Sequence, residues 1–215
     1  MTVSADNSTI SKLAISKLST SDDNFAQTLS DLIAWDMVSD TDVEDAVIAI
    51  LRQVKAQGDQ ALIDLTNRFD RRQVEEISQL VISQEQLQQA LESIDTETRT
   101  ALEIAAERIR DYHNHQEQPS WRYQEADGTV LGQQITPLDR VGIYVPGGKA
   151  SYPSSVLMNC IPARVAGVGE VIMMVPAPDG ELSPMVLAAA AIAGVDQVFT
   201  VGGAQAIAAL AYGTE

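Results

Sequence analysis

The sequence predicts an α/β protein in which an incomplete Rossmann-like parallel βαβαβα unit follows a helical, α+β N-terminal region. Three short β-branched segments in the last third each lead through a turn into an apolar helical run, the pattern of parallel strands joined by right-handed crossovers. Two of these turns are double glycines, Gly147-Gly148 and Gly202-Gly203. Such turns are typical of a ligand crevice at the carboxyl ends of parallel strands.

The chain begins with a segment of different composition. Residues 1–40 are rich in Ser, Thr and Asp with scattered apolar positions, which indicates an extended arm with short helices. We expect the apolar residues of this arm to dock on another surface; they are Phe25, Leu29, Leu32, Ile33 and Trp35.

Residues 41–139 form a second region, predicted as the first part of a domain. Thr41-Asp-Val-Glu44 fits a capping box and predicts the start of a helix. Gly58 then offers a stop and Asp59 a new cap. The remaining predicted elements are a strand at 77–82, a helix opened by the capping box Ser83-Gln-Glu-Gln86, a long helix at 97–116, and a hairpin of 121–125 with 130–136 around Asp127-Gly128.

Near residue 139 the pattern changes to strictly alternating strands and helices, so we predict a domain boundary there and a third region at 140–215. The alternation itself predicts strands at 141–145, 170–175 and 197–201, and helices at 154–167, 183–194 and 203–212.

The two glycine turns leave two interpretations open. Glycine occurs in strand-to-helix turns of many α/β proteins, but it also lets backbone approach a ligand. Tyr144 ends the first strand, where its ring and hydroxyl can meet a ligand, and Gln205 lies in the first turn of the last helix with both a donor and an acceptor. Neither turn is a G-x-G-x-x-G or a P-loop. Spacing alone therefore predicts a ligand crevice and leaves a nucleotide as one candidate occupant.

Composition excludes several classes of function. The net charge of −16 opposes binding to nucleic acid. No apolar run is long enough to cross a bilayer and no leader segment opens the chain, so we expect a cytoplasmic protein without membrane attachment. The single cysteine, Cys160, fits a reducing compartment and a buried thiol. His113 and His115 fall on different faces of one helix, so we predict no metal site there.

Segments from about Val43 to Glu215 closely resemble the histidinol dehydrogenase family. The matching segments are Val54-Lys-x-x-Gly58-Asp59-x-Ala61-Leu62-x-x-Leu65-Thr66-x-x-Phe69-Asp70, Tyr112-His113, Val141-Gly-Ile-Tyr-Val-Pro-Gly-Gly148, Tyr152-Pro-Ser-Ser-Val-Leu-Met158 and Val201-Gly-Gly-Ala-Gln-Ala-Ile-Ala-Ala-Leu210. Residues 1–40 add nothing to this resemblance.

The resemblance implies a zinc-dependent homodimeric enzyme of histidine biosynthesis that oxidises L-histidinol through the aldehyde to L-histidine and reduces two NAD. It implies that Tyr144 and Gln205 contact NAD, supported by the loops of Gly147, Gly148, Gly202 and Gly203. The zinc ligands, the acid/base pair and an asparagine that contacts NAD fall beyond Glu215 in the family's longer chain. No catalytic or metal-binding residue is therefore carried over to this sequence.

Three hypotheses follow for a chain of 215 residues. It is the N-terminal portion of a histidinol dehydrogenase and inactive alone, a stand-alone nucleotide-binding module, or a non-catalytic subunit completed by a separate C-terminal chain. The DNA downstream of codon 215 distinguishes them: a continuing frame supports the first, a stop without a partner gene the second, and a stop with one the third.

Overall fold

The computed structural model describes residues 17–33, 41–147 and 152–214, and it divides into two compact units, 1–46 and 47–215. In the first unit, helix α1 (Phe25–Ile33) has no buried residue, and Leu32 and Ile33 are more than half exposed. Trp35 lies outside the described residues, so docking of the arm stays a prediction. Among the described helices, none has the length and apolar character needed to cross a membrane.

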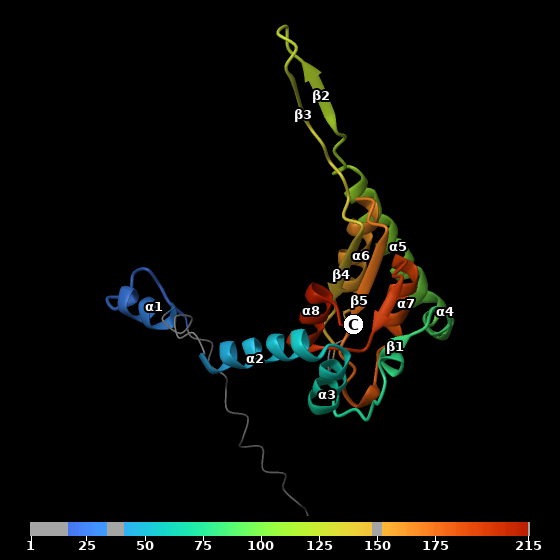
Figure 1. The fold of residues 1–215 in the computed structure, drawn as a ribbon. Helices are drawn as coiled ribbons and strands as arrows, with labels where there is room; N and C mark the ends of the chain where they lie inside the picture. Colours follow the sequence, from blue (N-terminus) through green and yellow to red (C-terminus); the bar gives the residue numbers. More distant parts are fainter. Residues whose placement is uncertain (1–16, 34–40, 148–151, 215) are drawn as a thin grey trace, which may run out of the picture. The chain divides into compact units, whose positions relative to one another are not determined.

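The second unit is built on a four-stranded sheet in the order β1-β6-β5-β4 (Figure 1). The predicted parallel strands are present as β4 (Arg140–Tyr144), β5 (Glu170–Met174) and β6 (Gln197–Phe199), paired β4 with β5 and β5 with β6. Helices follow each strand, namely α6 (Pro153–Val165), α7 (Pro184–Ala193) and α8 (Gly203–Tyr212). The predicted α/β class and its parallel unit are confirmed.

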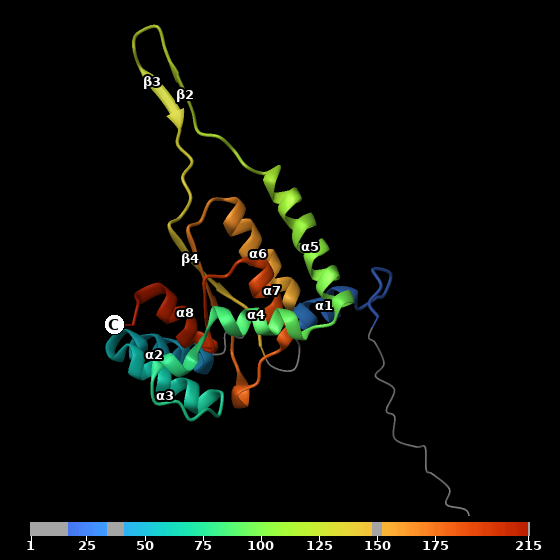
Figure 2. The ribbon, with the colours of Figure 1, turned by 90° about the vertical axis from the view of Figure 1, so that its right-hand side faces the viewer.

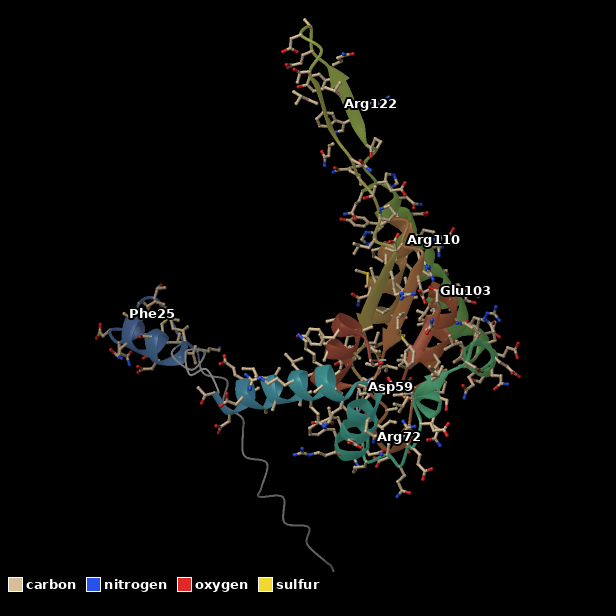
Figure 3. All side chains as sticks on the ribbon, in the orientation of Figure 1. Phe25, Asp59, Arg72, Glu103, Arg110 and Arg122 are labelled. Atoms are coloured by element: carbon tan, nitrogen blue, oxygen red, sulfur yellow. The ribbon has the colours of Figure 1, made fainter. Side chains whose placement is uncertain are left out.

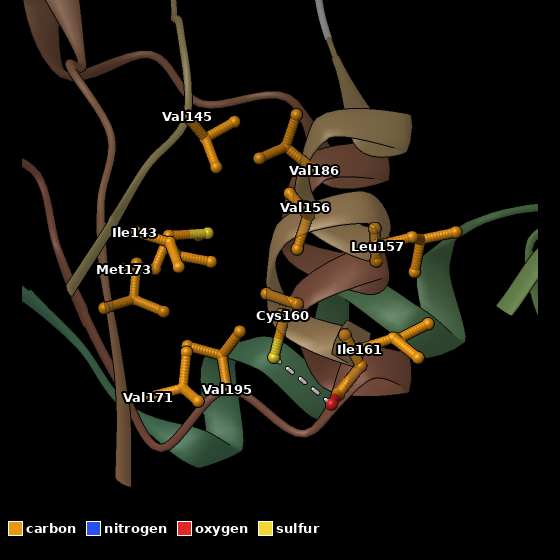
Figure 4. Packing of buried hydrophobic residues seen from close by; sticks show 14 of the residues in the cluster. Ile143, Val145, Val156, Leu157, Cys160, Ile161, Val171, Met173, Val186 and Val195 are labelled. Atoms are coloured by element: carbon orange, nitrogen blue, oxygen red, sulfur yellow. Dashed lines mark hydrogen bonds between the residues drawn. The ribbon is translucent and has the colours of Figure 1, made fainter. Parts of the chain in front are cut away.

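One face of the sheet carries the larger core, because every second strand residue points to it. Ile143, Val171 and Met173 face Val156 and Cys160 of α6, while Leu157 and Ile161 lie on the other side of that helix, within the same buried cluster (Figure 4). Helix α7 covers the same face, and the helices α4 (Gln84–Ser93) and α5 (Thr96–Asn114) pack outside it, α4 against α7 and α5 against α6. The resulting helical layer is visible along one side of the sheet in Figure 2.

The opposite face is covered by α8 and by α3 (Asp59–Phe69). Met174 and Val201 pack there with Leu62 of α3 and the alanines of α8. Gly142 of β4 has no side chain, and a Cβ atom there would lie 2.5 Å from Leu210 Cδ1. Helix α8 therefore runs directly over β4.

The predicted strand at 77–82 is wrong over most of its length. Ile77–Leu80 forms a 3₁₀ turn, and β1 is only Val81–Ile82, antiparallel to β6. The turn is favoured because the Gln79 side chain accepts hydrogen bonds from the backbone N–H groups of Glu75 and Glu76, at 2.6 and 3.1 Å. It brings the Leu80 side chain to complete burial.

Two predicted helix caps are also corrected. Thr41 is the first residue of α2 (Thr41–Gln57), not the residue before it. Asp59 is the first residue of α3, and Gly58 occupies the cap with a φ of 55°. A Cβ atom at Gly58 would lie 2.4 Å from the Thr214 carbonyl oxygen, which accepts the Asp59 N–H at 3.0 Å. The close approach of the chain after α8 demands glycine at this cap.

The other local predictions are confirmed. Ser83 caps α4 in a capping box with Gln86, α5 spans most of the predicted 97–116 helix, and β2 (Trp121–Gln124) pairs antiparallel with β3 (Val130–Gln133). Every residue of the two hairpin strands, including the labelled Arg122 in Figure 3, is exposed.

Elements from both sides of residue 139 share one core. Leu87 of α4 and Ala106 of α5 belong to the same buried cluster as Val156 of α6 and Val186 of α7. The change of pattern near residue 139 therefore marks the start of the alternating strands and helices within the second compact unit. The boundary between the two compact units lies between Ala46 and Val47.

Candidate functional site

The loops after β4, β5 and β6 meet at Pro176, at the carboxyl ends of the three parallel strands. A Cβ atom at Gly147 would lie 2.3 Å from the Pro176 carbonyl oxygen, and one at Gly202 would lie 2.4 Å from Pro176 Cβ. Both glycines therefore approach Pro176 more closely than a residue with a side chain can. Gly148, the other glycine of the first predicted turn, lies outside the described residues.

Tyr144 and Gly203 join the ends of β4 and β6. The Gly203 N–H donates to the Tyr144 hydroxyl at 3.2 Å, and Gly203 has a φ of 62°, which favours glycine. Tyr144 is the last residue of β4, as predicted. Its hydroxyl thus lies at the first turn of α8, where backbone N–H groups without helical acceptors favour a ligand with negative charge.

Gln205 completes this arrangement from the same turn of α8. Its side chain is 1% exposed, and its Oε1 atom is buried without a hydrogen-bond partner. Gly203 also makes room for it, since a Cβ atom there would lie 2.6 Å from Oε1. The structure therefore brings Tyr144 and Gln205 together at Gly203 and leaves an unpaired acceptor beside the helix start. Such an unpaired group is costly to keep buried.

Asp70 was given no role by the sequence, although it lies in one of the segments that carry the resemblance. It is 8% exposed at the end of α3. The backbone N–H of Ala177, the residue after Pro176, acts to lower the pKa of its carboxylate, whose Oδ2 atom is buried without a hydrogen-bond partner. The Asp70 carbonyl oxygen accepts the Asp179 N–H at 2.8 Å, and Arg71 forms an ion pair with Asp179. These bonds fasten the loop after β5 to α3, which a sequence pattern does not reveal.

We expect Asp70→Asn to raise the free energy of unfolding relative to the wild type, and to raise it more at neutral pH than near pH 4. Burial raises the pKa of Asp70, while Ala177, Arg72 and Arg71 oppose this rise. Because the folded protein then binds the proton more tightly than the unfolded chain does, the ionised carboxylate costs stability above the folded pKa. This cost disappears as the pH falls to the unfolded value of about 3.9.

Urea denaturation of both proteins across this pH range measures the effect. Asp70→Ala is the matched variant: it removes the whole carboxyl group at a position that is 8% exposed and leaves a cavity, so we expect it to be destabilised at every pH. A constant stability difference between wild type and Asp70→Asn at all pH values would contradict the prediction.

The other chemically interesting side chains have structural partners. The Cys160 thiol is buried and donates to the Ala193 carbonyl oxygen at 3.4 Å (Figure 4), and burial raises its pKa to about 11. His115 Nδ1 contacts the Asp111 carbonyl oxygen at 2.7 Å in the last turn of α5, and His113 Nδ1 contacts Gln116. No group of three or more His, Cys, Asp or Glu residues within the described ranges could hold a metal ion.

Comparison with known proteins gives a consistent result. A family model described as histidinol dehydrogenase matches residues 35–215. A histidinol dehydrogenase of Pseudomonas aeruginosa is 59% identical over 202 residues, and one of Aromatoleum aromaticum is 57% identical over the same length. Each alignment covers 94% of this chain and 46% of the relative. The chain thus spans about half the length of these relatives.

A solved structure shows a similar fold. The crystal structure of histidinol dehydrogenase from Elizabethkingia anophelis superimposes with a TM-score of 0.74 at 30% sequence identity. The superposition covers 80% of this chain and 40% of that one.

Proposed function

This chain belongs to the histidinol dehydrogenase family, and on that premise we propose that it supplies the NAD-contacting N-terminal half of an enzyme that oxidises L-histidinol to L-histidine. The observation that carries the proposal is the meeting of Tyr144 and Gln205 at Gly203, next to Gly202, which with Gly147 approaches Pro176 at the carboxyl ends of the parallel strands. Bound NAD would serve as the hydride acceptor.

The residues present fit such a cofactor. The N-terminus of α8 offers N–H groups to a phosphate, and the exposed glycines Gly147 and Gly203 keep the backbone accessible. The Gln205 amide oxygen has no protein partner, so a ligand donor would satisfy it after a small shift. The Tyr144 hydroxyl accepts the Gly203 N–H and so joins the start of α8 to the end of β4. The aromatic ring of Tyr144 lies at the same carboxyl end of the strands, where it offers a surface to a flat ligand.

We assign no zinc ligand and no acid/base residue within this chain. The zinc of the family, its acid/base pair and the residues that recognise L-histidinol are proposed to come from polypeptide that the longer relatives carry in addition. Proton transfer requires a group within hydrogen-bond reach of the reacting atom. We therefore expect no oxidation of L-histidinol by these 215 residues alone.

Titration with NAD tests the cofactor proposal directly. We expect the isolated chain to bind NAD with a Kd near 1 mM, about −4 kcal/mol, because part of the contact surface is supplied elsewhere. Amide NMR shifts at Gly203 and Gln205 would follow the titration, and Gln205→Ala would weaken it several-fold. The matched control is Gln60→Ala, which removes a glutamine whose side-chain partner is Asp64 on α3.

Two results would contradict this proposal in different ways. Micromolar binding that Gln205→Ala abolishes would favour a stand-alone nucleotide-binding module. Shifts confined to residues outside the three loops would remove Tyr144 and Gln205 from the cofactor site.

The remaining features of the family are also proposals for this chain. We propose a cytoplasmic setting, with which the free, buried Cys160 agrees. We propose a homodimer for the complete enzyme, and the exposed apolar side chains Trp121, Tyr123 and Val130 of the hairpin offer surface for such contacts.

A further inference from the structure

Arg72 places a guanidinium group beside the carboxyl ends of β5 and β6. Its Nη1 atom donates to the hydroxyl of Thr200, the residue directly after β6, at 3.4 Å. A Cβ atom at Gly180, in the loop after β5, would lie 3.7 Å from the Arg72 Nε atom. Because Arg72 itself follows α3 (Figure 3), its side chain joins the end of that helix to the loops after β5 and β6.

Most of the hydrogen-bond donors of this guanidinium are unused. The group carries five N–H donors, and the long bond to Thr200 is the one that it donates to a described residue. None of the ion pairs among the described residues includes Arg72. The neighbouring Arg71 differs, because it is exposed and pairs with Asp179. Arg72 is therefore a half-buried cation with donors available to a ligand.

The Asp70 carboxylate acts on Arg72 without taking up these donors. The two charges interact, since Arg72 acts to lower the pKa of Asp70, although burial raises that pKa by more. The Oδ2 atom of Asp70 is nevertheless buried without a hydrogen-bond partner. Asp70 thus weakens the field of the Arg72 guanidinium but leaves its N–H groups free.

Two strained residues fix the backbone on both sides of this guanidinium. Arg71 has a φ of 54° and Asp179 a φ of 56°, in the left-handed region that side chains disfavour. Such strain gathers at ligand-binding sites, where the surrounding structure holds it in place. The ion pair between the two residues joins the position before Arg72 to the position before Gly180.

The charge of the crevice calls for a cation at this place. The loops after the three parallel strands contain no Lys or Arg within residues 145–147, 175–183 and 200–202, where the charged side chains are Asp179 and Glu181. The whole chain has a net charge of −16. A dinucleotide carries two phosphate charges, so these loops alone would repel it.

We propose that Arg72 binds a phosphate group of the cofactor, an inference that rests on the proposed contact of Tyr144 and Gln205 with NAD. Thr200, which Arg72 contacts, precedes Gly202 at the start of α8 by two residues, at most about 7 Å of chain. Arg72 and the free N–H groups of α8 can therefore hold one pyrophosphate between them. A guanidinium suits this task because two of its N–H groups can bond two phosphate oxygens at once.

Titrations of the chain with NAD, followed by NMR, test this assignment. We expect Arg72→Gln to weaken NAD binding roughly fivefold, and Arg72→Lys, which keeps the charge, to recover most of the loss. Arg68→Gln is the matched control, because it removes the same charge from α3 while Arg68 lies over the Phe69 ring at 5.1 Å. We expect its binding to stay within about twofold of the wild type.

Two further measurements separate phosphate binding from a purely structural role of Arg72. Raising the NaCl concentration from about 50 to about 200 mM should weaken NAD binding more in the wild type than in Arg72→Gln, because salt screens the charge that the variant lacks. In the wild type, the Nε–H resonance of Arg72 should shift with NAD and with inorganic pyrophosphate, which has neither adenine nor nicotinamide. The second measurement needs no variant and holds even if Arg72→Gln fails to fold.

The proposal is overturned by equal weakening in Arg72→Gln and Arg68→Gln, or by the same salt dependence in Arg72→Gln and the wild type. It is also overturned if the Arg72 resonance stays fixed while Gln205 shifts with NAD. This last result removes Arg72 from the cofactor site and leaves the proposed function standing. If neither Arg72 nor Gln205 responds to NAD, the cofactor site itself is rejected together with the role of Arg72.

Discussion

Leu80→Ala is expected to lower the free energy of unfolding by about 2–5 kcal/mol. The Leu80 side chain is 0% exposed and belongs to the cluster of Leu62, Met174 and Val201 between the sheet and the helices α3 and α8. Its carbonyl oxygen accepts the Thr200 N–H at 2.7 Å, so the backbone is held in place and cannot collapse readily into the cavity.

Urea denaturation followed by circular dichroism measures this loss. Val81→Ala is the control, because Val81 is the next residue, lies in β1 and is 39% exposed; we expect it to cost about 1 kcal/mol or less. Equal losses for the two variants would mean that Leu80 does not occupy the core.

Gly202→Ala is expected to cost about 1–3 kcal/mol through overpacking. The added Cβ atom would meet Pro176 Cβ at 2.4 Å, and neither the loop after β5 nor the start of α8 can move freely. The former is bonded to the Asp70 carbonyl oxygen through the Asp179 N–H, and the latter is bonded to the Tyr144 hydroxyl through the Gly203 N–H.

A double-mutant cycle isolates this contact. Pro176→Gly removes the atom that Gly202→Ala would strike, so we expect the penalty of Gly202→Ala to fall by more than half in that background. Gly147→Ala is the matched control, because its Cβ atom would meet the Pro176 carbonyl oxygen at 2.3 Å, which Pro176→Gly retains. If the changes in unfolding free energy caused by Gly202→Ala and Pro176→Gly were additive, the loops after β5 and β6 would not be in contact.

Predictions that depend on local sequence agree closely with the structure. The parallel strands, the helices after them and the Ser83 cap were found because alternation, helical spacing and capping chemistry act over a few neighbouring residues. The places of Tyr144 at the end of β4 and of Gln205 in the first turn of α8 were predicted for the same reason, while their contact with NAD stays a prediction.

Local signals failed where distant segments compete. The 77–82 stretch has the composition of a strand, but the hydrogen bonds of the Gln79 side chain, together with burial of Leu80 against α3 and β5 residues, favour a 3₁₀ segment over most of it. Asp59 resembles a helix cap, but Gly58 takes that place because Thr214 lies against it. In each case contacts remote in sequence outweigh a weak local preference.

The sequence by itself determined the α/β class, the βαβαβα order and the positions of the two glycine turns, because each is encoded in short-range periodicity and backbone freedom. Only the tertiary structure decided that these turns meet at Pro176, that the Asp70 carbonyl oxygen fastens the loop between them, and that β4 is the edge strand of the sheet among the described residues. These features depend on packing between segments far apart in the chain, where close approach and hydrogen-bond satisfaction select one arrangement.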